Sequence, residues 1–319
     1  MATEVLQVVE TSASLFILFI AYEEADIASA VGHVYASAGK REKGVVPKQV
    51  LETNDTLRKL WASPSGALWV ASADGNVGTT AQVPWTAPIK GVTYTTMGNS
   101  PRWSSTALPK VKATGLKPNV TALWGTADSD VYAGTYGGHI YRWDGTAWTQ
   151  GFEGPGKGKG TIRAFGGASN DVYAVASQST ILHFDGRVWQ RLRAPEPPNG
   201  HEGFTGVTRT PQGEILISGS GEEGRLLHGS ASGGLEEFGR YPIQLIDMAP
   251  LADRVLFATG DGVAELLGRD VKMIKSTFKT ATMGPGIDRT FFIEPAQKVP
   301  SYVEYNPKIE SAPWWRVTF

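Results

Sequence analysis

The sequence predicts an all-β fold, a single closed β-propeller that spans residues 1–319, and three observations support this. A 25-residue unit occurs at 124–148 and again at 165–189 without a gap, and ten of the 25 aligned positions are identical. Each copy reads as short strands separated by turns, and repeats of about 40 residues with that pattern are typical of propeller blades. The 38 glycines, 19 prolines and 32 aromatic residues (10 Trp, 10 Tyr, 12 Phe) fit many short strands joined by tight turns.

The clearer copy divides into four strands. Residues 121–125 are predicted to form an inner strand, residues 131–134 a second strand and residues 139–143 a third, while Trp148 opens the outermost strand. Between the last two, Asp144-Gly145 predicts a hairpin turn with positive φ at both central positions.

The same succession of strand, turn and small residue continues through the weaker copies. It predicts seven four-stranded blades, with six as the alternative count. The expected boundaries are 1–55, 56–118, 119–158, 159–201, 202–241, 242–277 and 278–319.

The first blade contains an apolar run, residues 15–20. Acidic residues, Glu4 and Glu10, precede it where a signal peptide would carry positive charge, so we interpret the run as a buried strand. No apolar run approaches the length of a membrane span, and we expect a cytoplasmic protein without a membrane partner.

Closing a propeller normally requires one chain end to add a strand to the blade that contains the other end, because an unsealed seam leaves strand edges exposed. Residues 5–9 are the candidate. We expect them to join the last blade beside residues 314–318.

The longest departure from the repeat is the insertion at residues 84–117 in the second blade. Its aromatic residues Trp85, Tyr94 and Trp103 are the most independent of the repeat, and aromatic residues dominate binding hot spots, so they are candidate partner-binding residues. An elongated outer hairpin explains the insertion equally well. In the charged loop of the first blade, Arg41 and Lys43 are candidates for steering a partner electrostatically.

Charge and cysteine content exclude some classes of partner. The 30 basic and 31 acidic residues give a net charge of −1, which provides no overall field to hold nucleic acid or an anionic membrane. The chain has no cysteine, and therefore neither disulfides nor thiolate metal ligands, which fits a reducing compartment.

The repeat resembles a loosely defined class of bacterial propeller repeats, which combine an inner Trp-Gly, a central Asp-Val-Tyr-Ala and a terminal Asp-Gly-x-x-Trp. In this sequence residues 124–125, 130–133 and 144–148 carry the resemblance, which is also loosely similar to WD40 and kelch repeats in composition. It implies a propeller and no specific activity. Stand-alone bacterial propellers of this size include immunity proteins that block a toxin.

No catalytic, cofactor-binding or metal-binding motif is recognisable. His183 and His228 occupy equivalent blade positions, which indicates a packing role. Five aspartates could cluster at one end of the channel as glycosidase carboxylates or as a calcium site, but Asp130 and Asp171 stand where turn formers are expected. The five are Asp128, Asp130, Asp171, Asp247 and Asp253.

These observations favour a non-enzymatic, monomeric protein-binding propeller, with a toxin as one conceivable partner. A carbohydrate-binding propeller is the first alternative. A glycan-active hydrolase or lyase is the second, with less support from the sequence. A lectin would repeat its binding residues, whereas here only structural positions repeat. We expect four aromatic residues of the repeat to pack between blades: Trp124, Phe165, Trp148 and Trp189.

Overall fold

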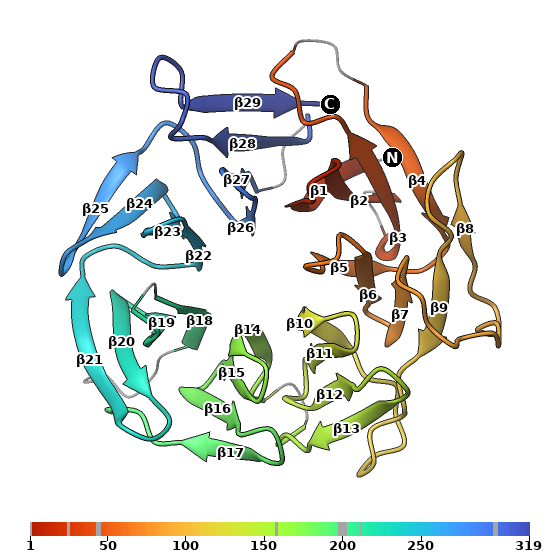
Figure 1. Cartoon of the computed structure of the whole chain (residues 1–319), viewed down its shortest axis with the longest axis horizontal. Helices are drawn as coiled ribbons and strands as arrows, with labels where there is room; N and C mark the ends of the chain where they lie inside the picture. Colours follow the sequence, from red (N-terminus) through yellow and green to blue (C-terminus); the bar gives the residue numbers. More distant parts are fainter. Residues whose placement is uncertain are drawn as a thin grey trace.

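The computed structural model describes residues 2–23, 26–42, 46–156, 159–196, 203–210, 212–295 and 299–319. These residues form seven antiparallel sheets arranged as a ring, with the innermost strands around the central axis (Figure 1). The prediction of a seven-bladed, all-β propeller is confirmed. In the described part of the chain no helix is long and apolar enough to cross a membrane.

Each blade is built from one contiguous stretch of chain, apart from one added strand. Blades 1 and 2 contain β1 (Ala2–Glu10), β2 (Leu15–Glu23), β3 (Asp26–Ser37), β4 (Lys48–Thr53), then β5 (Leu57–Ala62), β6 (Leu68–Ser72), β7 (Asn76–Thr79) and β9 (Ser104–Ala107). Blades 3 and 4 contain β10 (Val120–Ala127), β11 (Asp130–Thr135), β12 (Ile140–Trp143), β13 (Trp148–Phe152), then β14 (Ile162–Ala168), β15 (Asp171–Ala176), β16 (Thr180–Phe184) and β17 (Trp189–Leu192).

The remaining three blades follow the same order. Blades 5 and 6 contain β18 (Gly203–Arg209), β19 (Ile215–Ser220), β20 (Gly224–Ser230), β21 (Gly234–Tyr241), then β22 (Asp247–Leu251), β23 (Arg254–Thr259), β24 (Gly262–Leu267) and β25 (Asp270–Lys275). Blade 7 contains β26 (Thr282–Pro285), β27 (Thr290–Ile293), β28 (Ser301–Tyr305) and β29 (Trp314–Thr318).

The up-and-down order of four strands gives the ring two different faces. The turns between the first and second strands and between the third and fourth strands lie on one face, which we call the hairpin face. The close approach of Gly145 to Ser129, and of Gly186 to Asn170, shows the two kinds of turn side by side. The opposite face, the linker face, carries the remaining turns and the connections between blades.

The hairpin turn at Asp144 differs from the prediction of two positive φ values. Only Gly145 has a positive φ, of 91°. The Asp144 carboxylate instead accepts hydrogen bonds from the main-chain N–H groups of Thr146 and Ala147, each at 2.9 Å. This side-chain cap supports a four-residue turn in which the aspartate keeps an ordinary backbone conformation.

Aromatic side chains fill the spaces between blades. Trp148 is 7% exposed and packs edge-on against Trp69 of blade 2, and Trp189 is 6% exposed and packs against Tyr132 of blade 3. Phe165 is buried in the same cluster as Trp189. The packing role expected for these repeat positions is confirmed.

The prediction that residues 5–9 join the last blade is wrong. They belong to β1, which pairs with β2 as the innermost strand of blade 1, and blade 7 forms all four of its strands from residues 282–318. Both chain ends lie at the same boundary between blades (Figure 1), but no strand crosses it in the described part of the chain. The apolar run at residues 15–20 is a strand within this blade, as expected.

Side chains close this seam. Val8 and Phe19 of blade 1 share an apolar cluster with Phe291 and Tyr302 of blade 7. At the hairpin face Arg289 forms ion pairs with Glu10, from Nε at 2.9 Å, and with Glu304, from Nη1 at 2.9 Å. The buried apolar contact and the charged pairs replace the shared strand.

A strand is shared instead between blades 1 and 2. Part of the second-blade insertion forms β8 (Tyr94–Thr96), which pairs with the outer edge of β4 and makes blade 1 five-stranded. The chain then returns to blade 2 as β9. The insertion therefore covers a strand edge that would otherwise be exposed.

Candidate functional site

The centre of the ring holds two stacked cavities of about 430 and 450 Å³. The first lies toward the hairpin face and is lined by the later residues of the innermost strands. The second lies toward the linker face. Four residues line both cavities and define what we call the channel waist: Lys59, Arg163, Asp247 and Thr282.

Asp247 opens β22 and links blades 6 and 7. Its carboxylate accepts hydrogen bonds from Thr282 Oγ1 at 2.7 Å and from the main-chain N–H groups of Met283 at 3.0 Å and Met248 at 2.9 Å. Burial raises the pKa of Asp247 above its ordinary value, and these hydrogen bonds with the charge of Lys59 offset only part of that rise. Both carboxylate oxygens thus accept hydrogen bonds from within the protein.

Lys59 and Arg163 are the cations of the waist. They come from the innermost strands of blades 2 and 4, and neither side chain has a hydrogen-bond or ion-pair partner among the described residues. Burial lowers the pKa of Lys59, Asp247 raises it again and Arg163 lowers it further. The positive charge of Arg163 therefore disfavours the protonated form of Lys59.

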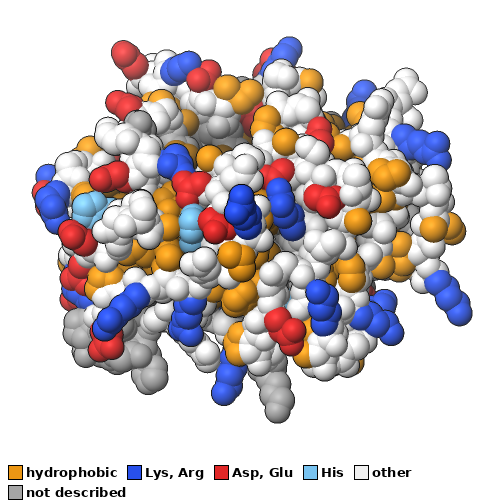
Figure 2. All heavy atoms as spheres, turned by 60° about the horizontal axis from the view of Figure 1, so that its bottom comes forward, with side chains coloured by type: hydrophobic (Ala, Val, Ile, Leu, Met, Phe, Trp, Pro, Cys, Tyr) orange, Lys and Arg blue, Asp and Glu red, His pale blue; other side chains and the backbone are white. Residues whose placement is uncertain are grey.

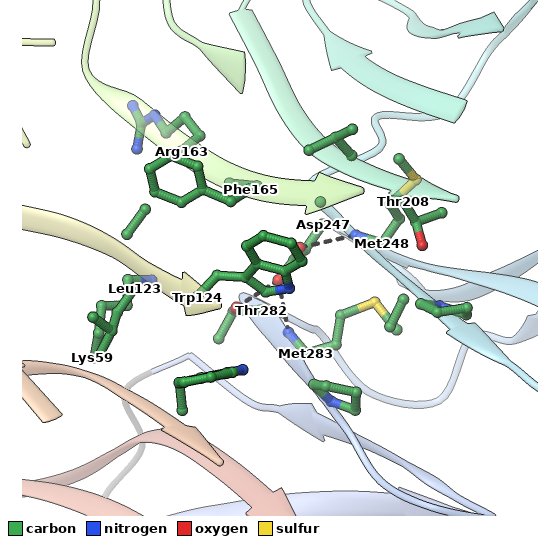
Figure 3. A pocket seen from close by; sticks show the side chains of 18 of the residues that line it. Lys59, Leu123, Trp124, Arg163, Phe165, Thr208, Asp247, Met248, Thr282 and Met283 are labelled. Carbon is green, nitrogen blue, oxygen red and sulfur yellow. Dashed lines mark hydrogen bonds between the residues drawn. The ribbon is translucent and has the colours of Figure 1, made fainter. Parts of the chain in front are cut away.

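Large side chains surround the mouth of the channel on the hairpin face. Trp61, Trp124 and Phe165 come from blades 2, 3 and 4, and Met248 and Met283 from blades 6 and 7. Figure 3 shows the indole of Trp124 extending into this pocket. Trp124 also contacts Tyr132 of its own blade, so it combines the expected packing role with a surface in the pocket.

An aromatic residue recurs at the mouth in blades 2 to 4 and a methionine in blades 6 and 7, but no residue type continues around the whole ring. Blade 2 contributes Lys59 and Trp61, blade 4 Arg163 and Phe165, and blade 5 Thr208 with Arg209, while the remaining blades present other side chains. A site with repeated ligands would show the same residue at each equivalent position. The asymmetry of this pocket instead fits a single asymmetric ligand.

The five aspartates considered from sequence do not gather at the channel. Asp128 accepts hydrogen bonds from Ser65 Oγ at 2.6 Å and Trp69 Nε1 at 3.2 Å of the neighbouring blade, and Asp253 is exposed on a turn. Asp247 alone of the five lines the cavities. Among the described residues no group of three or more histidines and carboxylates is arranged to hold a metal ion.

Asp130 and Asp171 take part in a pattern that the sequence did not suggest. In blades 3 to 7 an acidic and a basic side chain face each other across the second and third strands, at equivalent positions. The pairs are Asp130–Arg142, Asp171–His183, Glu214–His228, Arg254–Glu265 and Arg289–Glu304. The acid precedes the base in blades 3 to 5, and the order is reversed in blades 6 and 7.

The two histidines of this pattern were expected to be packing residues. His183 does pack against Tyr173, with ring centroids 4.7 Å apart, but its Nε2 also lies 2.7 Å from Asp171. His228 lies edge-on to Phe238 and faces Glu214 at 3.5 Å. Their equivalence therefore reflects contact with an acidic side chain as well as packing.

The structure places the aromatic residues of the insertion against the blades. Trp103 is 5% exposed and donates a hydrogen bond from Nε1 to the carbonyl of Val50 at 3.1 Å. Tyr94 donates its hydroxyl hydrogen bond to Asp55 at 2.8 Å, and Trp85 packs edge-on against Trp143. Trp85 and Tyr94 keep some exposed surface, and binding of a partner by any of the three stays a prediction.

The two basic candidates of the first blade have different outcomes. Arg41 lies in the seam, where its Nε is 2.7 Å from Glu304 and its Nη2 is 2.9 Å from the carbonyl of Pro313. The Arg41 side chain is 14% exposed, and these contacts give it a structural role. Lys43 lies outside the described residues.

Basic and acidic side chains are interspersed over the face shown in Figure 2, with apolar side chains between them. No large region of one sign gathers there. This distribution agrees with the balanced composition, in which 30 basic residues meet 31 acidic ones.

Comparisons with known proteins identify the fold and no family. No protein-family model matches the chain, and no curated protein matches it. Among solved structures, virginiamycin B lyase from Staphylococcus aureus superposes with a TM-score of 0.64 at 12% identity, covering 92% of each chain. YCF48 bound to D1 peptide gives 0.55 at 12% identity over 84% of this chain and 82% of the other. The computationally designed Ika8 protein gives 0.56 at 12% identity over 96% and 84%.

Lys59 and Arg163 were not predicted as site residues from the sequence. Both lie in inner strands next to apolar residues, in Leu57-Arg58-Lys59-Leu60 and Ile162-Arg163-Ala164-Phe165. A charged residue in a strand that lines a propeller axis is a usable signal, because burial of an unpaired charge is unfavourable unless it faces a solvated channel.

Proposed function

We propose that this protein is a protein-binding propeller that receives part of one partner at the mouth of its channel on the hairpin face. The observation that carries the proposal is the composition of this mouth: Trp61, Trp124 and Phe165 beside Arg209, in a cavity of about 430 Å³. Tryptophan and arginine in a partly desolvated pocket are the residues that most often dominate binding energy.

The asymmetry of the pocket supports a protein partner over a repeated glycan. Blades 2 to 4 present aromatic residues, blade 5 presents Thr208 and Arg209, and blades 6 and 7 present methionines, so a ligand must match several chemically distinct positions at once. A partner loop can supply such a combination of apolar and polar groups. In this proposal the propeller binds its partner as a monomer. A toxin that the propeller neutralises is one such partner.

Affinity capture tests the proposal with a matched pair of variants. Trp124→Ala removes an aromatic side chain from the channel mouth, and Tyr136→Ala removes an exposed aromatic side chain from a turn on the linker face. A partner retained from source-cell lysate by the wild type and Tyr136→Ala but lost by Trp124→Ala supports the proposal. Equal retention by all three proteins contradicts it.

One observation favours an enzyme as a second candidate. Asp247 and Lys59 share the channel, and burial shifts the pKa of the carboxyl upward and the pKa of the amine downward, as general acid–base groups require. A substrate screen with Asp247→Ala as control tests this. Turnover by the wild type that the variant lacks establishes catalysis, and a glycan array run in parallel tests the carbohydrate alternative.

A further inference from the structure

We propose that the channel waist binds a carboxylate, the side chain of an Asp or Glu that the partner inserts between Lys59 and Arg163. This inference rests on the proposed function and specifies the chemistry of the inserted group. It depends on the position of the two cations, on their lack of partners among the described residues and on the charge balance of the waist.

The cations are available to a ligand. Four arginines elsewhere in the blades each pair with a carboxylate: Arg142, Arg209, Arg254 and Arg289. Arg163 and Lys59 have no such partner in the described part of the chain, although each lines both cavities. Two cations without ion-pair partners on the wall of a channel attract an anion more strongly than they would on an open surface.

Asp247 does not neutralise them directly. Its carboxylate is occupied by Thr282 Oγ1 and by two main-chain N–H groups, and no ion pair joins it to Lys59 or Arg163. Its hydrogen bonds also fix its orientation toward blades 6 and 7. The approach to the two cations therefore stays open from the hairpin face.

The charge balance selects a monoanion. Lys59 and Arg163 contribute two positive charges and an ionised Asp247 one negative charge, which leaves a single positive charge. A carboxylate balances this charge, whereas a dianionic phosphate would add repulsion from Asp247. Arginine also binds a carboxylate in a planar, two-pronged arrangement.

The surroundings indicate a carboxylate carried on a partner side chain. Trp124, Phe165 and Met248 line the cavity between the waist and the hairpin face, so apolar atoms accompany the acidic group into the channel. The partner segment thus presents an acidic residue next to a large apolar one. Its apolar neighbour contacts the mouth while the carboxylate reaches the waist.

Ligand-induced thermal stabilisation at low salt provides the first test. The probe is N-acetylglutamate amide, which carries one side-chain carboxylate, and its neutral control is N-acetylglutamine amide. We expect saturable stabilisation by the first and none by the second, with affinity reduced about tenfold or more in Lys59→Met and in Arg163→Gln. Lys308→Met, a change at an exposed ion pair on blade 7, should leave the affinity unchanged.

Asp247→Asn gives a test that loss of folding cannot mimic. Removing the negative charge should tighten binding of the probe several-fold, because the repulsion between Asp247 and the probe carboxylate is lost. The Asn side chain keeps an acceptor for Thr282 and Met283. Unchanged or weaker binding in this variant overturns the proposal. So does tighter binding of inorganic phosphate than of the glutamate probe by the wild type.

Elution from the affinity matrix separates this inference from the proposed function. If excess glutamate probe releases a partner that depends on Trp124, and the glutamine probe does not, both stand. A partner that depends on Trp124 yet is retained by Lys59→Met and by Arg163→Gln, with no binding of the probe, leaves the protein-binding function intact and overturns the carboxylate site.

Discussion

Nε2 of His183 lies 2.7 Å from Oδ1 of Asp171, at the two positions where the preceding blade has Arg142 and Asp130. The acid is the same in both blades and the base differs. Asp171 also receives a hydrogen bond from Arg209 of the next blade, so this pair is tied into the boundary between blades 4 and 5.

Replacing His183 tests whether the position opposite Asp171 requires a basic side chain. His183→Arg recreates the pair of blade 3, and we expect the free energy of unfolding to change by less than about 1 kcal/mol. His183→Glu places a like charge beside Asp171 and should destabilise the protein by more than about 1 kcal/mol. Urea denaturation monitored by tryptophan fluorescence measures both, and equal losses in the two variants contradict a charge requirement.

The Asp144 turn predicts a specific acid dependence. Hydrogen bonds from the Thr146 hydroxyl and from the N–H groups of Ala147 and Thr146 lower the pKa of Asp144 to about 2. Because the folded pKa lies below the unfolded value of about 3.9, the turn contributes stability that is complete above about pH 4 and is lost as the pH falls toward 2. NMR titration of the carboxyl checks the pKa.

Asp144→Ala is the matching substitution for this turn. The difference in unfolding free energy from the wild type should shrink as the pH falls from 5 to 2. A difference that is constant over that range means that the charge of Asp144 does not contribute.

The seam predicts that Arg289 stabilises the ring. Arg289→Met leaves Glu304, which is 2% exposed, with Arg41 as its remaining cation and leaves Glu10 without Arg289. We expect a loss of about 3 kcal/mol in unfolding free energy, because a buried charge is left poorly compensated. Lys308→Met removes an exposed pair on the same blade and should cost less than about 1 kcal/mol. Similar losses in both variants would show that burial of the network has no special effect.

The repeat tryptophans should differ in what they support. Trp148→Ala and Trp189→Ala remove buried side chains and are expected to cost about 3 to 5 kcal/mol each. Trp124 is partly exposed in the channel, so Trp124→Ala should cost less stability and lose partner capture. Wild-type stability of Trp148→Ala with lost capture would move the binding site to the space between blades.

Tyr94 lies in β8, the strand that the second-blade insertion adds to blade 1, and we predict that its hydroxyl group stabilises this arrangement. Tyr94→Phe removes the hydrogen bond to Oδ2 of Asp55, which then keeps only the bond from Asn76, at 3.0 Å. A loss of about 1 to 2 kcal/mol is expected. Tyr136→Phe changes a tyrosine that is 56% exposed and serves as the control. Calorimetric melting that does not separate the two variants would exclude this role.

The sequence predicted the blades because the repeat is local. The seven blades could be placed from the spacing of strands and turns, and residues 120–152 form the expected four strands. The partner of β1 could not be predicted in this way, because pairing is non-local and the apolar pattern of residues 5–9 fits an inner strand in blade 1 and an edge strand in blade 7 equally well.

The site was less accessible to sequence reasoning for a related physical reason. Lys59, Arg163 and Asp247 come from blades 2, 4 and 6 and meet only because the ring closes. None of them belongs to the repeated motif. The acid–base pairs of blades 3 to 7 could not be detected because acid and base change places between blades, which removes the residue identity on which a repeat search depends.

The seam between blades 1 and 7 has a consequence for how such a ring can change over generations. In a propeller that is closed by a shared strand, both ends of the chain must form strands of the same sheet. Here blade 7 is one uninterrupted segment that meets blade 1 through side chains and through the close approach of Gly284 to the carbonyl of Val8. Duplication or deletion of about 40 codons at the C-terminal end can therefore add or remove a whole blade without breaking any other sheet.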